Sequence, residues 1–152
     1  MIDLVLRPIA ESDSDWYAAN IDDEIIRWSR EEAVEDSTSW WRSVDRSRLV
    51  IDCCGDSVGS AKVSVSDHRI EISYWIAPDH RRRGYASRAL SIMTAEVADA
   101  RSGRPIELEI HPDNAGSIRT AERSGYRFHD FRVSCDTCAD ESGRVAVYRF
   151  SG

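Results

Sequence analysis

The sequence predicts a mixed α/β fold, in which one central and mostly antiparallel sheet carries helices packed against it. The first observation is size, since 152 residues is a usual length for a single domain with its own core. The second is composition, because 41% hydrophobic and 31% charged residues are typical of a globular protein. The third is the order of periodic segments: a strand, two helices, three strands, a helix, a strand, a helix and two strands. No linker or repeat divides them, so we treat residues 1–152 as one domain.

The N-terminal segments predict one strand and two helices. Residues 3–9 read as a short strand that a proline ends. Ser12, followed three residues later by an aspartate, resembles a capping box, so a helix is predicted to begin there. Residues 20–36 are acidic and irregular, and a second helix over about 37–47 carries two adjacent tryptophans.

Three strand-like runs come next, over residues 49–53, 58–66 and 69–77. Short turn signals separate them, which predicts an antiparallel meander. A long amphipathic helix follows over about 86–101, with apolar residues at helical spacing, and Gly103 ends it.

The C-terminal segments complete the sheet. Residues 106–110 predict a short strand, and residues 114–124 predict a helix that Gly125 stops. Residues 126–134 and 144–150 read as two final strands joined by a polar loop.

Charge and hydropathy exclude several classes of partner. The chain has 27 Asp and Glu against 20 Lys and Arg, a formal net charge of −7. Nucleic-acid binding needs a surplus of positive charge, so we expect no nucleic-acid partner, whereas a cationic small molecule or peptide suits this balance. No apolar run approaches the roughly 20 residues that span a bilayer, and the N-terminus lacks the pattern of a signal peptide. We therefore expect a cytoplasmic protein without a membrane partner.

The four cysteines are expected to be free thiols in that compartment. Cys135 and Cys138 have the spacing of a chelate, and Cys53 with Cys54 could supply further ligands. Adjacent strand residues point to opposite faces of a sheet, however, so both members of that second pair do not easily join one site. No metal is expected.

The most informative segment lies between a strand and the start of the long helix, at residues 76–87. A helix N-terminus presents unpaired backbone N–H groups and attracts anions. Gly84 allows close approach of a phosphate, and Arg81–Arg83 add positive charge to an otherwise acidic protein. The segment therefore predicts a diphosphate site, with a solvated basic turn as the alternative.

Two motifs here resemble those of a known family. Arg81-x-x-Gly84-x-Ala86 after a strand resembles the acyl-CoA-binding signature of the GNAT superfamily of N-acyltransferases. Asn114-x-x-Ser117, on a helix that ends in a Gly-aromatic pair, is similar to that family's second signature. The resemblance covers essentially the whole chain and is nearest to the Rim-like branch, which acetylates protein N-termini and some small amines. It implies a sheet splayed between the fourth and fifth strands and flanked by about four helices.

The resemblance also implies how acetyl-CoA binds. Backbone amides of the turn would cradle the pyrophosphate, pantetheine would insert where the strands splay, and Asn114 would bind the pantetheine arm, in addition to capping its helix. The cofactor-binding residues implied are Trp75, Ile76, Ala77, Arg81, Arg82, Arg83, Gly84, Tyr85, Ala86, Ser87 and Asn114.

The implied reaction is direct attack of an amine on a thioester, and it needs a base, because an amine with a pKa of ~10.4 is mostly protonated at neutral pH. Glu71 is the candidate base, on one strand face with Ser73 and Trp75; an exposed strand glutamate is the alternative. Ser117 is the candidate proton donor to the leaving thiolate. Many family members use a tyrosine for that step, and the matching position here is Ala121.

The acceptor is expected to be an amine of a small molecule or of a protein N-terminus. The resemblance implies that the first two helices and their loop cover the acceptor site. Here that region combines carboxylates with tryptophans, which suits a cation. The candidate substrate-binding residues are Glu24, Trp28, Trp40 and His111, the last also a possible base; a solvated acidic loop with core tryptophans is the alternative. Two other readings keep the fold: a non-catalytic acyl-CoA-binding sensor or scaffold, and a different acyl donor. The chain is expected to be a monomer or a homodimer.

Overall fold

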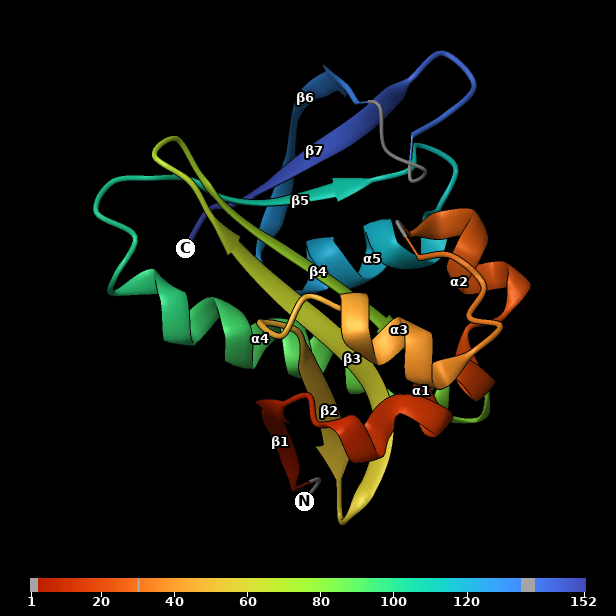
Figure 1. The fold of residues 1–152 in the computed structure, drawn as a ribbon. Coiled ribbons are helices and arrows are strands. Elements are labelled where there is room, and N and C mark those ends of the chain that lie inside the picture. The colour runs from red at the N-terminus through yellow and green to blue at the C-terminus, as the bar shows by residue number, and fades with distance from the viewer. Residues whose placement is uncertain (1–2, 30, 135–138) are drawn as a thin grey trace.

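A computed structural model describes residues 3–29, 31–134 and 139–152, and it contains one sheet of seven strands in the order β1-β2-β3-β4-β5-β7-β6 (Figure 1). The strands are Leu4–Pro8 (β1), Leu49–Cys53 (β2), Asp56–Val65 (β3), Ile70–Ile76 (β4), Ile106–Ile110 (β5), Tyr126–Val133 (β6) and Arg144–Phe150 (β7). Neighbouring strands are antiparallel except for β4 and β5, which are parallel. The predicted mixed and mostly antiparallel sheet is therefore confirmed, as is the meander over β2, β3 and β4.

The parallel pair β4 and β5 is short. Its register contains two residue pairs, Ile70 with Ile106 and Glu71 with Glu107. Beyond Glu71, β4 continues to Ile76 while β5 turns away toward β7, so the described strands leave an opening in the sheet. This opening is the predicted splay between the fourth and fifth strands.

Helices cover both faces of the sheet, with α4 and α5 on one face and α1, α2 and α3 on the other (Figure 1). The helices are Ser14–Asn20 (α1), Asp23–Trp28 (α2), Ser37–Ser43 (α3), Tyr85–Ala98 (α4) and Ala115–Arg123 (α5), with 3₁₀ turns at Glu11–Asp13 and Pro78–His80. Among the described residues, none of these helices combines the length and apolarity needed to cross a bilayer.

Two apolar cores result, one on each face. The larger core joins α4 and α5 to the side chains of β4 that point toward them, such as Ile70 and Ile72. The smaller core holds Tyr17 of α1 and Trp75 of β4. Because successive strand residues point to opposite faces, β4 contributes alternately to both cores.

Two local predictions in the N-terminal region are wrong. Ser12 does not form the expected capping box; Asp13 accepts from the Ala10 backbone N–H at 2.8 Å and binds Arg7 through two hydrogen bonds. The segment expected to be irregular contains α2, which begins after Asp22, whose carboxylate accepts from the Ile25 N–H at 3.0 Å. A six-residue helix is too short to show a clear apolar period, which is why periodicity missed it.

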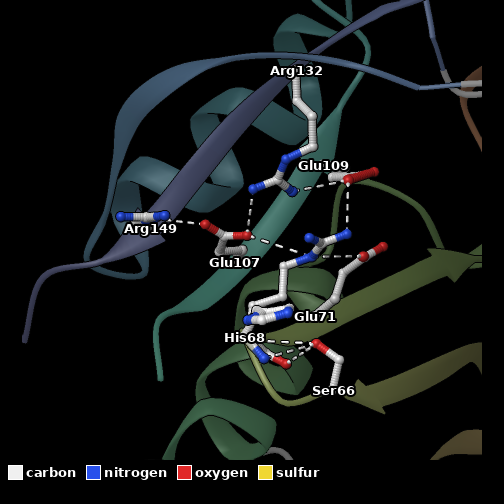
Figure 2. A network of polar contacts seen from close by, with 8 residues as sticks. Ser66, His68, Glu71, Glu107, Glu109, Arg132 and Arg149 are labelled. Carbon is white, nitrogen blue, oxygen red and sulfur yellow. Dashed lines mark hydrogen bonds and ion pairs between the residues drawn. The ribbon is translucent and has the colours of Figure 1, made fainter. Parts of the chain in front are cut away.

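The closed end of the opening holds a buried carboxylate. Figure 2 shows Glu107 on β5 between Arg132 of β6 and Arg149 of β7, and its side chain is 0% exposed. Arg149 donates to it at 2.6 Å and Arg132 at 2.9 Å. Burial disfavours the charged form, but these two hydrogen bonds outweigh it and hold the pKa of Glu107 below its usual range.

The same network extends toward the opening. Arg132 also donates to Glu109 at 3.0 Å, and Arg69 has nitrogen atoms 3.7 to 3.8 Å from oxygens of Glu71, Glu107 and Glu109. Arginines from three different segments thus hold acidic side chains of β4 and β5 together where the two strands still pair.

Glu107→Gln is expected to lower the free energy of unfolding by about 3 kcal/mol, because it leaves Arg149 without its buried countercharge and Arg132 with Glu109 alone. Since the pKa of Glu107 is lowered in the folded state, the wild-type protein loses this stability as pH falls below about 4.5, whereas the variant loses less over the same range. Urea denaturation at several pH values measures both effects. The exposed Glu96→Gln on α4 is the control, and an equal loss in that variant would contradict the assignment.

Candidate functional site

A cleft of about 900 Å³ occupies the opening between β4 and β5. We name two parts of it. The turn half is lined by residues 81, 82 and 84–87 and by α5. The α2 half is lined by α2, β3 and the acidic side chains of β4 and β5. Each half lies on a different side of the opening, so β4 separates two chemically distinct environments.

The turn half is built around the start of α4. Gly84 is the N-cap residue, with φ of +83°, a left-handed conformation that glycine adopts without strain. It has no side chain to cap the helix, so the first N–H groups of α4 lack the usual side-chain acceptor. Nothing lies within 4 Å of where a Cβ would be placed on Gly84, and the space beside the turn is open. An uncapped N-terminus next to open space is suited to an anion.

Arg81 departs from the expectation that all three arginines add charge to the turn. Its guanidinium binds the Asp22 carboxylate through two hydrogen bonds of 2.8 Å and Glu24 through one of 2.7 Å. The hydrogen bonds from Arg81 lower the pKa of Asp22, although burial opposes them. No ion pair engages Arg82 or Arg83 within the part of the chain that the structure describes, so the positive charge of the turn rests on these two exposed residues. Arg81 instead connects the turn to the N-terminus of α2.

The opposite wall of the turn half is the start of α5. Asn114 caps this helix, and its Oδ1 accepts from the Ser117 N–H at 3.2 Å. The Ser117 hydroxyl lies 3.5 Å from the hydroxyl of Tyr74 on β4, and both residues line the cleft. The sequence interpretation missed Tyr74. Strand alternation could have found it, since Tyr74 points to the face opposite Glu71 and Trp75.

The α2 half contains the candidate base. Glu71 lines the cleft, with an Arg69 nitrogen 3.8 Å from its carboxylate. Trp28 also lines this half, and its ring meets the imidazole of His111 edge-to-face, with the ring centroids 4.9 Å apart. Trp40 stacks on the buried Tyr17, with the ring centroids 4.2 Å apart, and packs against the smaller core.

Carboxylates of the α2 half are paired with arginines. Glu31 binds Arg48 at 2.6 Å, and Glu109 binds Arg132 at 3.0 Å. Glu24 is held by Arg81, as described above. Each of these three carboxylates therefore already has an arginine partner, although Arg81 is shared with Asp22 and Arg132 with Glu107.

The cleft brings together most residues predicted from the sequence. Those that line it are Glu24, Trp28, Glu71, Trp75, Ile76, Arg81, Arg82, Gly84, Tyr85, Ala86, Ser87, Asn114 and Ser117. Those that do not are Trp40, Ala77, Arg83 and His111. Thirteen of the predicted residues thus line one cleft, and the other four do not.

The cysteine expectations have mixed outcomes. Cys135 and Cys138 lie outside the described residues. Cys53 ends β2, and Cys54 follows in a turn with φ of +56°, so their sulfurs are 3.7 Å apart rather than on opposite faces. Both are free thiols. The described residues contain no group of three or more His, Cys, Asp or Glu side chains that could hold a metal ion.

Comparison with known proteins agrees with this geometry. The family model described as acetyltransferase (GNAT) domain matches residues 3–127. An acetyltransferase of the GNAT family from Bacillus anthracis has a TM-score of 0.81 at 18% identity, covering 99% of this chain and 98% of that one. No curated protein sequence is similar enough to count as a match.

Two further solved structures contain coenzyme A. Spermidine N-acetyltransferase from Vibrio cholerae, in complex with CoA and spermine, has a TM-score of 0.77 at 18% identity over 97% of this chain and 94% of that one. RimL, a ribosomal L7/L12 alpha-N-protein acetyltransferase in complex with coenzyme A, has a TM-score of 0.78 at 16% identity over 96% and 92%. At these identities the likeness shows a shared fold, which confirms the predicted fold class.

The Arg81–Asp22 pair is expected to contribute about 1 kcal/mol of coupling free energy, because it is bidentate but partly exposed. A double-mutant cycle of Arg81→Gln and Asp22→Asn, followed by urea denaturation, measures this coupling. If the double variant loses as much free energy of unfolding as the two single variants together, the contact does not stabilise the fold. Asp23→Asn, at the exposed first residue of α2, provides the matched control.

Proposed function

The chain belongs to the acetyltransferase (GNAT) domain family, and on that premise we propose that it transfers an acetyl group from acetyl-CoA to an amine by direct attack. The observation that carries the proposal is the meeting of an uncapped helix N-terminus and a strand opening in one cleft. An anion site next to unpaired strand edges suits a ligand that has both a diphosphate and an extended amide-containing arm.

Acetyl-CoA would bind along the turn half. The pyrophosphate would rest on the backbone N–H groups of residues 81–86, with Arg82 and Arg83 nearby to balance its charge. The pantetheine arm would pair with the edge of β4 that β5 leaves uncovered, in the manner of an added strand. The Asn114 amide would bind the arm, in addition to capping α5. This arrangement would bring the thioester to the opening itself.

The amine would arrive from the α2 half. Glu71 would remove its proton, and a backbone N–H near Trp75 or Ile76 would stabilise the developing oxyanion. The nitrogen–carbon bond forms as the carbon–sulfur bond breaks, and the thiolate takes a proton from Ser117 on the other side of β4. The alternation of β4 supports this division, since Glu71 faces one half of the cleft and the α5 helix lies on the other.

The acceptor we propose carries a single reactive amine, on a small molecule or at a protein N-terminus as in the Rim-like branch. The support is that Glu24, Glu31 and Glu109 of the α2 half are each already bound to an arginine. A polycation would have to compete with those arginines for the same carboxylates. A cytoplasmic location accompanies this proposal.

A non-catalytic acyl-CoA sensor or scaffold is the second candidate. The observation that favours it is Ala121, which is 0% exposed in the larger core and supplies no hydroxyl where many family members have a tyrosine. Such a protein would bind acyl-CoA without releasing CoA.

Thiol release from acetyl-CoA, followed with a chromogenic thiol reagent, separates the two candidates. The panel of acceptors contains a short peptide with a free N-terminus, a small monoamine, spermidine and an aminoglycoside. Amine-dependent release, strongest with the single-amine acceptors, is the expected result. Binding of CoA by calorimetry without any release would support the sensor, and no binding would overturn both candidates.

Gly84→Val is expected to weaken CoA binding by about 10-fold or more, because a branched side chain at a left-handed residue both strains the turn and fills the phosphate space. Gly103→Val is the control. Gly103 has φ of +80° and open space around it, but it does not line the cleft. Calorimetry measures the affinity of both variants for CoA. If the two affinities are equal, the turn does not bind CoA.

Glu71→Gln is expected to reduce kcat by about 100-fold or more, with the affinity for CoA unchanged, since it removes the base but not the donor site. Steady-state kinetics with the best acceptor measures this loss. Glu109→Gln changes a neighbouring carboxylate of the same cleft and should retain most activity. A larger loss in that variant would transfer the role of base to Glu109.

A further inference from the structure

The hydroxyl of Tyr74 is a reactive group of the cleft that the proposed chemistry does not use. It comes from the middle of β4, inside the part of that strand that β5 no longer covers. Its partner is the Ser117 hydroxyl of α5 at 3.5 Å, so a phenol and an alcohol from distant segments meet at the wall of the opening.

Strand alternation places this pair on one side of the reacting bond. Tyr74 packs with the larger core on the α4 and α5 side, whereas Trp75 belongs to the smaller core on the α1 side. The turn that would hold the diphosphate begins α4 on that same side. The sulfur of a bound thioester would therefore lie nearer to Tyr74 and Ser117, and the attacking amine nearer to Glu71.

A serine alone is a poor source of a proton. An aliphatic alcohol is far less acidic than a phenol, and a tyrosine has an unperturbed pKa of about 10. Ser117 can pass on a proton efficiently only if a stronger acid replaces it at once, and Tyr74 is placed to do so. The family resemblance implies a tyrosine on the helix for this step, but position 121 carries alanine.

We propose that Tyr74 is the ultimate proton donor to the leaving thiolate, with Ser117 as the relay between them. This inference rests on the proposed acetyl transfer. As the carbon–sulfur bond breaks, its electron pair stays on sulfur, the sulfur takes the Ser117 proton, and Ser117 takes the proton of Tyr74. The proton that the amine loses to Glu71 passes to water, and water returns one to the tyrosinate, so protons balance over the cycle.

The surroundings of Tyr74 suit a group that stays protonated until needed. Burial raises the pKa of Tyr74, although the Ser117 contact works against this. Tyr74 in turn contributes to raising the pKa of Tyr126 of β6, whose hydroxyl is bound to Thr94 of α4 at 2.7 Å. Tyr126 thus has its own partner, which leaves the contact between Tyr74 and Ser117 as the route into the cleft.

The test compares two donors that differ in the leaving atom. With acetyl-CoA, Tyr74→Phe is expected to reduce kcat by about 10-fold or more at unchanged affinity for CoA. With the selenoester analogue of acetyl-CoA, which releases a much weaker base, the same variant should regain most of the wild-type rate. A merely structural role would lower both rates equally, so equal losses would overturn the proposal.

Ser117→Ala tests the relay independently of Tyr74→Phe. It should show the same rescue by the selenoester, and the double variant should be no slower than the slower single variant, because both residues serve one transfer. If the fold-reduction in kcat of the double variant equals the product of the two single reductions, the residues act independently and the relay is wrong. Tyr126→Phe removes a buried phenol hydroxyl nearby, and it should leave kcat within about 2-fold of wild type for both donors.

The outcomes also separate this inference from the proposed function. If the wild-type protein shows no amine-dependent turnover with either donor, the acetyl transfer itself is wrong, and the role of Tyr74 with it. If the wild-type protein is active and Tyr74→Phe retains full kcat with acetyl-CoA, only the proton donor is wrong.

Discussion

The structure depends on the parting of β4 from β5 after two residue pairs. Further pairing would close the sheet and remove the cleft. Strands that part leave backbone donors and acceptors without sheet partners, which is costly unless a ligand or water satisfies them. Arg69, which directly precedes β4, lies 3.7 to 3.8 Å from Glu107 and Glu109 of β5 and so links the two strands at the closed end. The length of the opening is thus set by a side-chain network at one end and by the turn before α4 at the other.

Charge is distributed unevenly in this acidic protein. Many arginines are committed to carboxylates within the fold, as in the pairs of Arg7 with Asp13 and Arg48 with Glu31. Arg82 and Arg83 are exposed and carry no such pair among the described residues, so the turn is locally positive within a chain of net charge −7. The carboxylates of the α2 half are bound to arginines, whereas the turn half carries free positive charge, so the two sides of one cleft have different electrostatic preferences.

Sequence reasoning succeeded where a local pattern determines the structure. The apolar spacing after the glycine turn predicts the start of α4 to within one residue, and the meander follows from short turns between alternating strands. It failed where the outcome depends on distant partners. The ion pairs of Arg81 join residues almost sixty positions apart, and the contact of Tyr74 with Ser117 spans more than forty. Neither follows from spacing along the chain. Helix α2 was missed because it is short, although Asp22 followed by two acidic residues is a recognisable start signal.

The attachment of Arg81 to the start of α2 restricts how this fold can be recombined. A chimaera that replaces residues 20–48 with the equivalent segment of another protein would exchange α2 and α3 while keeping the turn. Unless the incoming segment offers a carboxylate near position 22 or 24, the graft would leave a half-buried guanidinium without a counterion, and the cost would fall on the turn itself. A segment grafted into this position therefore needs, before any other property, an acidic side chain that can bind Arg81.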